Sequence, residues 1–502
     1  MNGNPAGGSA AEAPTVLSFD VAALADGPPL AAGWPLWQRF GFRFLLVYYV
    51  LYAFPRPFSS LLETALGVVA LVDGWVKTAL LGELPFRWFG HWVKELGKVE
   101  TQGWQPLTTQ LAEWNLTPYS VIHQPTGSGD TGHDIARMLV IALAASLLAS
   151  LWSLLQRGPG GHGRLARWLH LFVRFDLAFT MLGYGLAKFY GGQFGELSLD
   201  RLTQEIGDTW PMTMVGTFMQ ASKPYELFGG GCEVLAGLLL FSRRTALLGA
   251  VAAFATMTNV CALNWLCGVP VKLYSAHLLV AAALLMAPYA GNLWALFVSN
   301  RPTRAVDLAV VRSRWAAWPL GIAGWVWVGS SLLLTHLGGT AEKPWMKGRE
   351  KGALYGVWTV DAMLLDGVEV PITDATRWRF LAIDRGTLAW AREATGQRRN
   401  FEFVLDATTL VAQVKPRTGA PAAAGEAAAP EPWTCEVGTK VMPVDPPLLL
   451  RNGERGRKVD GERRTLVVKG KLGDKQLELR THAKQFRLQT GFRLRQELPD
   501  FW

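Results

Sequence analysis

The sequence predicts a polytopic α-helical membrane protein that ends in a small antiparallel β-domain. Only 18% of the 502 residues are charged and 50% are hydrophobic, whereas soluble domains carry about 25% charged residues. Long apolar runs recur from residue 40 to residue 338, and short runs of alternating polar and apolar residues follow from residue 356. This composition argues against a fully soluble chain, and four cysteines exclude a disulfide scaffold.

The N-terminal 38 residues are predicted to form a disordered cytoplasmic tail. Residues 1–38 contain no Lys or Arg and are rich in Ala, Gly and Pro. A secretory signal needs basic residues ahead of its apolar stretch, and the first basic residue is Arg39. We therefore interpret this segment as a tail and not as a signal peptide.

Seven apolar runs are predicted to cross the membrane as helices. A helix rises about 1.5 Å per residue, so about 20 residues span a hydrocarbon core that is ~30 Å thick. The runs lie at 40–54, 135–156, 168–190, 224–241, 245–265, 273–298 and 317–337. The runs divide the chain into four predicted regions. Residues 39–160 contain the first two membrane helices, 165–300 a four-helix membrane core, 315–340 the last membrane helix, and 350–502 the β-domain.

Basic residues predict how these helices are oriented. Arginines gather in the loop 157–167, at Arg243 and Arg244, and in the loop 299–314. With seven crossings, all three places lie on one side, and Lys and Arg collect in cytoplasmic loops. The N-terminus is therefore predicted to be cytoplasmic and the β-domain to lie outside. The net charge of +9 then reflects topology, and no nucleic-acid partner is predicted.

One apolar stretch, residues 61–81, is not counted as a crossing. It carries Glu63, Asp73 and Lys77, and a crossing there would place every later basic loop outside. We predict an external amphipathic helix that lies on the membrane and continues through residues 86–98.

Residues 168–298 resemble the DoxX-like family of small four-helix membrane proteins. The resemblance rests on MLGYGLAKFY at 181–190, on the run at 223–250 that begins KPYELFGGGC, and on the run at 258–288 that begins TNVCALNWLC. TGSGDTGHD at 126–134 resembles an external motif of longer bacterial members, which also carry extra membrane helices and a C-terminal β-domain. The resemblance implies a bacterial inner-membrane protein with a periplasmic β-domain, related to subunits of thiosulfate:quinone oxidoreduction. Gly268 stands where the family leads us to expect an acidic residue, so no carboxylate role is carried over there.

Polar residues inside the predicted membrane helices are the candidate site. A charge near the bilayer centre costs at least about 2.5–3.5 kcal/mol, so such residues need a partner or a purpose. The predicted catalytic residues are Glu233, Lys188, Lys272 and His277, and the predicted ligand contacts are Tyr184, Glu226, Asn259 and Asn264. Most of them are expected to gather in the outer half of the bundle, with Glu233 deeper. They would bind a quinone carbonyl or relay its protons; the alternative is a structural ion-pair network.

Two other features allow narrower predictions. In GSGD at 127–130, which lacks the Lys-Ser/Thr of a phosphate loop, Asp130 is expected to cap the second membrane helix. Cys261 and Cys267 can pair only if the fifth helix ends between them, because six helical residues separate Cα atoms by about 9 Å. No CxxC or HExxH motif occurs, so zinc has no support.

The C-terminal region is predicted to be an antiparallel barrel or sandwich. Period-2 runs separated by Gly, Asp and Asn turns are typical of such folds. The runs lie at 356–361, 377–383, 387–392, 400–405, 409–414, 465–470, 476–481 and 486–490. Residues 416–432 are predicted to be a flexible insertion and 451–464 a charged loop.

The first of these strands contains Gly356-Val357-Trp358, which resembles the G-x-W that opens lipocalin-like barrels. In such barrels the Trp closes the base and stacks on an Arg from a late strand, for which Arg487 and Arg493 are the candidates. We expect a barrel interior filled by side chains, with a bound small ligand as the alternative.

Two functions from different classes remain open. The first is a bacterial inner-membrane protein that handles a quinone as a subunit or accessory of a membrane oxidoreductase. The second is a non-enzymatic membrane scaffold whose external β-domain binds a partner protein or lipid. The sequence leaves open whether the protein is an enzyme. A transporter is less favoured, because no inverted repeat or paired broken helices stand out.

Overall fold

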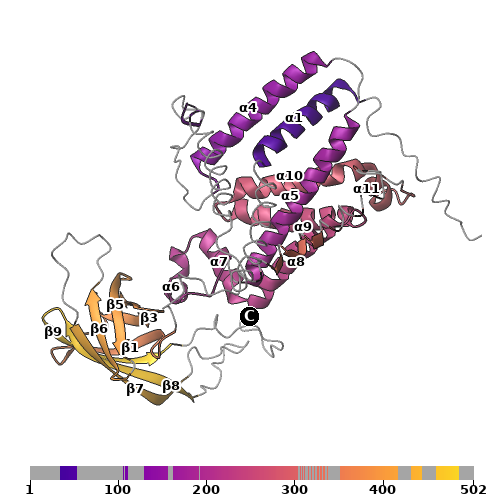
Figure 1. Cartoon of the computed structure of the whole chain (residues 1–502). Helices are drawn as coiled ribbons and strands as arrows, with labels where there is room; N and C mark the ends of the chain where they lie inside the picture. Colours follow the sequence, from indigo (N-terminus) through magenta and orange to yellow (C-terminus); the bar gives the residue numbers. More distant parts are fainter. Residues whose placement is uncertain are drawn as a thin grey trace, which may run out of the picture. The chain divides into compact units, whose positions relative to one another are not determined.

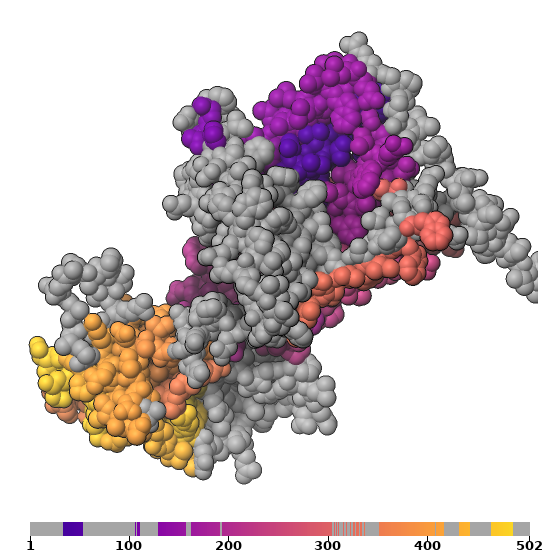
Figure 2. Space-filling view, viewed as in Figure 1, coloured from indigo at the N-terminus to yellow at the C-terminus, as the bar shows by residue number. Residues whose placement is uncertain are grey.

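The computed structural model describes residues 34–53, 106, 108–110, 129–156, 162–190, 193–303, scattered positions between 306 and 336, and then 351–406, 408–416, 431–443 and 460–484. Contacts within the chain divide it into two compact units. One comprises Met1–Gly185 with Cys232–Leu334, and the other Leu186–Gly231 with Thr335–Trp502. Figure 1 shows the elements, and Figure 2 shows the strands as an orange and yellow surface.

Long helices make up most of the described residues before 300. They are α1 (Leu36–Ala53), α4 (Gly132–Leu155), α5 (Gly163–Phe189), α8 (Lys223–Phe241), α9 (Ala246–Leu266) and α10 (Lys272–Met286). A proline in a helix interior removes a backbone hydrogen bond, and Pro288 lies where α10 passes through η2 (Ala287–Tyr289) into α11 (Ala290–Phe297). Between α5 and α8 lie α6 (Leu199–Thr203), η1 (Ile206–Asp208) and α7 (Pro211–Ala221).

Four helical segments among the described residues are long and apolar enough to cross a membrane. They are Gly132–Leu155, Lys223–Phe241, Ala246–Leu266 and Lys272–Phe297, which match the second, fourth, fifth and sixth predicted runs. The prediction of several helices long and apolar enough to cross a membrane is therefore confirmed. The first and third runs form the helices α1 and α5, while residues 61–81 and 86–98 lie outside the described residues.

Small side chains allow α1 and α4 to pack closely. Along α4, Gly132, Ala136, Ala145 and Ala149 are buried, and the two helices run side by side (Figure 1). In a bilayer, small residues at helix interfaces let backbones approach. Leucines on the other face of α4 are exposed, which is the pattern of a lipid-facing side; they are Leu139, Leu143, Leu147, Leu151 and Leu154.

The strands form a closed eight-stranded antiparallel barrel, as predicted. Strands β1 and β3 to β9 pair in sequence order, and β9 pairs back to β1, while the short β2 extends only β1. The strands are β1 (Gly356–Leu365), β2 (Val368–Glu369), β3 (Trp378–Ile383), β4 (Leu388–Glu393), β5 (Arg398–Asp406), β6 (Val411–Pro416), β7 (Glu431–Pro443), β8 (Asp460–Leu472) and β9 (Lys475–Ala483).

Two predicted boundaries in the β-domain were wrong. Strand β7 begins inside the predicted insertion 416–432, and β8 begins at Asp460, inside the predicted charged loop. The reason is that β7 presents only Trp433 and Cys435 to the core, between exposed Thr434 and Glu436. Val437 and Val441 continue the alternation of apolar residues but are exposed. The predicted strand 486–490 lies outside the described residues.

Side chains from the strands fill the barrel interior. The rings of Trp378 and Phe401 lie 6.3 and 5.7 Å from that of Trp433, and Trp433 covers Gly470 so closely that a Cβ there would overlap the ring. Cys435 lies in the same core. Burial raises the pKa of its thiol to about 11, so this cysteine stays protonated and unreactive at neutral pH.

Trp358 is held at one end of the barrel by its own neighbours and by β8. Its indole Nε1 donates to the carbonyl of Leu354 at 3.0 Å. The guanidinium of Arg464 lies 5.5 Å from the ring centroid, and Arg464 also donates to the carbonyl of Ala353. The cation–π partner among the described residues is therefore Arg464, whereas the predicted candidates Arg487 and Arg493 lie outside them.

The segment that contains α6 packs on the outer face of the barrel. Leu199, which is 1% exposed, lies in a cluster with Val357, Ala382 and Trp390. Acidic residues of this segment pair with basic residues of the barrel region: Glu196 with Lys351 and Arg385, Asp200 with Arg398, and Glu205 with Arg379. Burial would raise the pKa of Glu196, but hydrogen bonds from Lys351 and Arg385 lower it overall.

The apolar contact is expected to dominate the docking of this segment. Leu199→Ala should cost about 2–5 kcal/mol and raise the rate of tryptic cleavage after Arg201 at least about tenfold. Glu196→Gln should cost less than about 1 kcal/mol, because its carboxylate is exposed, and its contribution is lost as the pH falls through its lowered pKa. A larger effect of Glu196→Gln than of Leu199→Ala at pH 7 would contradict this order.

Candidate functional site

The loop that contains Gly129 and Asp130 contacts the loop that precedes α10. The amide of Gly129 donates to the carbonyl of Pro270 at 2.8 Å. The carboxylate of Asp130 accepts from the backbone amides of Lys272 at 2.8 Å and Leu273 at 2.9 Å, and its Oδ2 lies 3.4 Å from the Lys272 ammonium. Asp130 therefore caps α10 by a contact across 142 residues.

The prediction that Asp130 caps the second membrane helix was wrong. Thr131 is the N-cap of that helix, α4, and forms a reciprocal capping box with Asp134. An Asp just before a helix is usually expected to cap that helix, but here Thr131 already caps α4. Asp130 instead satisfies the first amides of α10, whose own N-cap, Val271, has no side-chain acceptor.

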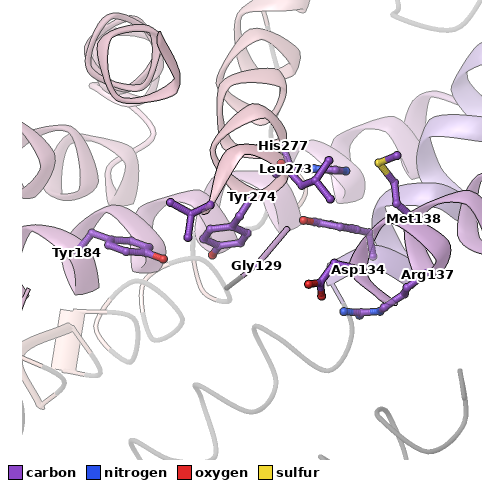
Figure 3. Close-up of a pocket in the computed structure, with 10 residues that line it drawn as sticks. Gly129, Asp134, Arg137, Met138, Tyr184, Leu273, Tyr274 and His277 are labelled. Atoms are coloured by element: carbon purple, nitrogen blue, oxygen red, sulfur yellow. Dashed lines mark hydrogen bonds between the residues drawn. The ribbon is translucent and has the colours of Figure 1, made fainter. Parts of the chain in front are cut away.

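A cavity of about 270 Å³ adjoins this junction. Its lining comes from α1, α4, α5, α10 and the two loops, and consists of Tyr52, Gly129, Asp134, Arg137, Met138, Tyr184, Val271, Leu273, Tyr274 and His277. Figure 3 shows Tyr184 and Tyr274 toward one side and Asp134 and Arg137 toward the other. Aromatic faces and a few polar groups are typical of small-molecule pockets.

Three stacked rings lie at one wall of the cavity. Tyr52 and His277 line it, and Tyr48 lies behind them. The ring of Tyr52 lies 3.8 Å from that of His277 at an interplanar angle of 7°, and Tyr48 is nearly parallel to both. His277 Nδ1 lies 2.7 Å from the carbonyl of Leu273 and therefore donates to it. In the neutral imidazole this is the Nδ1–H tautomer, and its Nε2 then accepts from the Tyr48 hydroxyl at 2.7 Å.

The lining contains two further tyrosines. The rings of Tyr184 and Tyr274 lie 6.1 Å apart, and the Tyr274 hydroxyl lies 3.4 Å from Thr180 Oγ1. Tyrosine hydroxyls can donate or accept, and the Arg137 guanidinium only donates. The cavity thus combines a flat aromatic wall with several groups able to bind a carbonyl oxygen.

The eight predicted site residues are only partly brought together. Tyr184 and His277 line the cavity, and Lys272 lies between two lining residues. Glu233 and Asn264 are buried, at 4% and 6% exposed, but are not among the lining residues. Asn259 lies on an exposed face of α9.

Lys188 and Glu226 belong to the other unit. Both are buried, at 6% and 1% exposed. Glu226 Oε2 accepts from the Lys223 ammonium at 2.7 Å, and Lys223 also donates to the Lys188 carbonyl. This arrangement is the kind expected of a structural ion pair at the beginning of α8.

The cavity contains residues that the sequence analysis did not single out. Tyr52, Asp134, Arg137 and Tyr274 line it, and Tyr48 lies behind them. The only local signal was the spacing of Tyr48 and Tyr52, which places both rings on one helix face. Among the described residues, no three His, Cys, Asp or Glu side chains form a group that could hold a metal ion.

Cys261 and Cys267 are not joined by a disulfide. Helix α9 runs without a break from Cys261 to Leu266, Cys267 is its C-cap, and both cysteines are free. A continuous helix keeps their Cα atoms about 9 Å apart, which is beyond the reach of a disulfide.

Comparison with known proteins gives one relative. No family model matches the sequence, and no solved structure matches it. A stretch of 113 residues, 22% of this chain, is 38% identical to the protein YwoB of Bacillus subtilis, which is described as uncharacterized, and covers 71% of that protein.

Proposed function

The chain belongs to the family of the Bacillus subtilis protein YwoB, and on the chemistry of its own cavity we propose that it is a membrane protein that binds a quinone headgroup. In this proposal it has a DoxX-like core in a bacterial inner membrane, with a cytoplasmic N-terminus and a periplasmic barrel. It acts as a subunit or accessory of a membrane oxidoreductase.

The stacked wall of the cavity carries the proposal. Flat rings prefer offset stacking on other rings, and the Tyr52–His277 pair offers such a surface within a cavity of about 270 Å³. Quinone carbonyls are acceptors, and the hydroxyls of Tyr184 and Tyr274 and the guanidinium of Arg137 are donors in the same cavity. A pocket that combines aromatic faces with a few converging donors suits such a ligand.

Protons are the second requirement of quinone chemistry. The Tyr48 hydroxyl donates to His277 Nε2, so the aromatic wall contains a short hydrogen-bonded chain with one titratable imidazole. Glu233, buried in α8, remains the carboxylate that we propose as a proton relay. The source of electrons would be the partner oxidoreductase.

The expected result is that quinone copurifies with the protein and that the cavity tyrosines determine its affinity. A hydrogen bond is worth about 0.5–1.5 kcal/mol, so the double variant Tyr184→Phe/Tyr274→Phe should weaken binding about tenfold. The measurement is mass spectrometry of the protein in native lipids, followed by titration with short-chain benzoquinone and naphthoquinone probes.

Tyr289→Phe is the matched control, because Tyr289 lies in η2 and does not line the cavity. It should bind both probes as the unmodified protein does. Absence of quinone from the native-lipid sample and from both titrations would sink the proposal. Equal affinity of the double variant and the control for the probes would show that quinone binds outside this cavity.

A membrane scaffold is the second candidate, and the packing of the barrel favours it. Because side chains fill the barrel interior, a partner protein or lipid would have to bind the outer surface. A stoichiometric protein partner in the same purification, without quinone, would support this function instead.

A further inference from the structure

Helix α7 combines an apolar composition with a position next to a membrane-crossing helix. Its sequence, PMTMVGTFMQA, contains no charged residue. It ends at Ala221, and only Ser222 separates it from α8, which is long and apolar enough to cross a membrane. The chain must therefore leave α7 within one residue of the point where α8 begins.

The exposed face of α7 is apolar, which is not the pattern of a helix that meets water. Thr213 and Met219 are buried, and the side-chain amide of Gln220 donates to the carbonyl of Phe194 at 2.6 Å. On the other face, Trp210, Met214 and Phe218 follow one another at four-residue spacing and are 78%, 49% and 57% exposed. A polar face would be expected there if it met water.

This exposed face continues onto the first turns of α8. The ring of Phe218 lies 5.1 Å from that of Tyr225, and Tyr225 lies 6.3 Å from Phe228. Phe228 is 66% exposed, and Leu235, seven residues later on the same face of α8, is 57% exposed. The apolar face of α7 is thus continuous with the lipid-facing side of a membrane helix.

We propose that α7 lies in the plane of the bilayer interface, with Trp210, Met214 and Phe218 inserted among the lipids. Eleven residues extend only about 16 Å, which is too short to cross the hydrocarbon core. An apolar helical face in the interface gains from burial in the headgroup and acyl boundary, and Trp is favoured at that depth. The interface, and not a protein partner, covers this face.

The test is the accessibility of a nitroxide label on α7 in liposomes of phosphatidylcholine and phosphatidylglycerol. Single cysteines are introduced at Met214 and Phe218 after the four native cysteines are replaced by alanine. Relaxation by oxygen, which concentrates in lipid, is compared with relaxation by a polar nickel chelate, which stays in water. Both labels should favour oxygen over nickel as strongly as a label at Leu235, which is 57% exposed on the membrane-length helix α8.

Two controls make each outcome decisive. Thr213→Cys reports the buried face of the same helix, and Asp474→Cys reports an exposed turn of the barrel. Nickel accessibility at Met214 and Phe218 equal to that at Asp474 would show that the face meets water and overturn the proposal. Low accessibility to both reagents, as at Thr213, would show that a second copy or another protein covers it, and would also overturn the proposal.

Discussion

Trp358→Ala is expected to lower the free energy of unfolding of the β-barrel by about 3–5 kcal/mol. Trp358 is 1% exposed and is fixed by the Leu354 carbonyl and by Arg464. Removing the indole leaves a cavity at the barrel end, which neighbouring strands cannot close because their hydrogen-bond register fixes them. Such a loss is a large share of the stability of a domain of this size.

The measurement is urea unfolding of a fragment that spans residues 350–502. The fragment should first show a strand spectrum with little helix by circular dichroism, because the eight strands close on themselves. Val404→Ala is the control, since Val404 lies on β5 and is 48% exposed, so it should change stability by less than about 0.5 kcal/mol. Equal midpoints for the Trp358 variant and the unmodified fragment would contradict the packing described here.

The membrane helices could be predicted because their signal is local. Each crossing needs a run of about 20 apolar residues, and α4, α8, α9 and α10 show such runs directly. Most barrel strands were predicted from their apolar alternation of period 2. Strand β7 was missed although Trp433, Cys435 and Val437 alternate within it, and its pairing with β8 makes it visible.

The cavity could be predicted only in part because its residues meet over long sequence distances. The carboxylate of Asp130 binds amides 142 residues away, and the Tyr48 hydroxyl binds an imidazole 229 residues away. A sequence rule that ranks intramembrane charges pointed to Lys188 and Glu226, which lie in another unit. Of the three tyrosines that line the cavity, only Tyr184 was predicted, whereas Tyr52 and Tyr274 were not.

The second large effect is expected where α5 and α8 cross. At Gly237 an added Cβ would lie 2.9 Å from the backbone carbonyl oxygen of Ala178 and 2.9 Å from Leu182 Cγ. The Leu182 side chain can rotate away, but the Ala178 carbonyl belongs to the helix itself. Gly237→Val should therefore push the two helices apart and destabilise the bundle by about 1–3 kcal/mol or more, the usual cost of overpacking.

Gly231→Val on the same helix separates this cause from the change in helix propensity. A Cβ at Gly231 meets nothing within 4 Å, while the intrinsic effect of replacing Gly by Val is the same at both positions. The thermal midpoint in detergent should fall clearly for Gly237→Val and stay close to that of the unmodified protein for Gly231→Val. Tyr184, which lines the cavity, lies on α5 two residues after Leu182. Gly237→Val should therefore also loosen the cavity and weaken binding of the quinone probes. Parallel losses in both glycine variants would instead mean that chain stiffness, and not the crossing, governs the stability of the bundle.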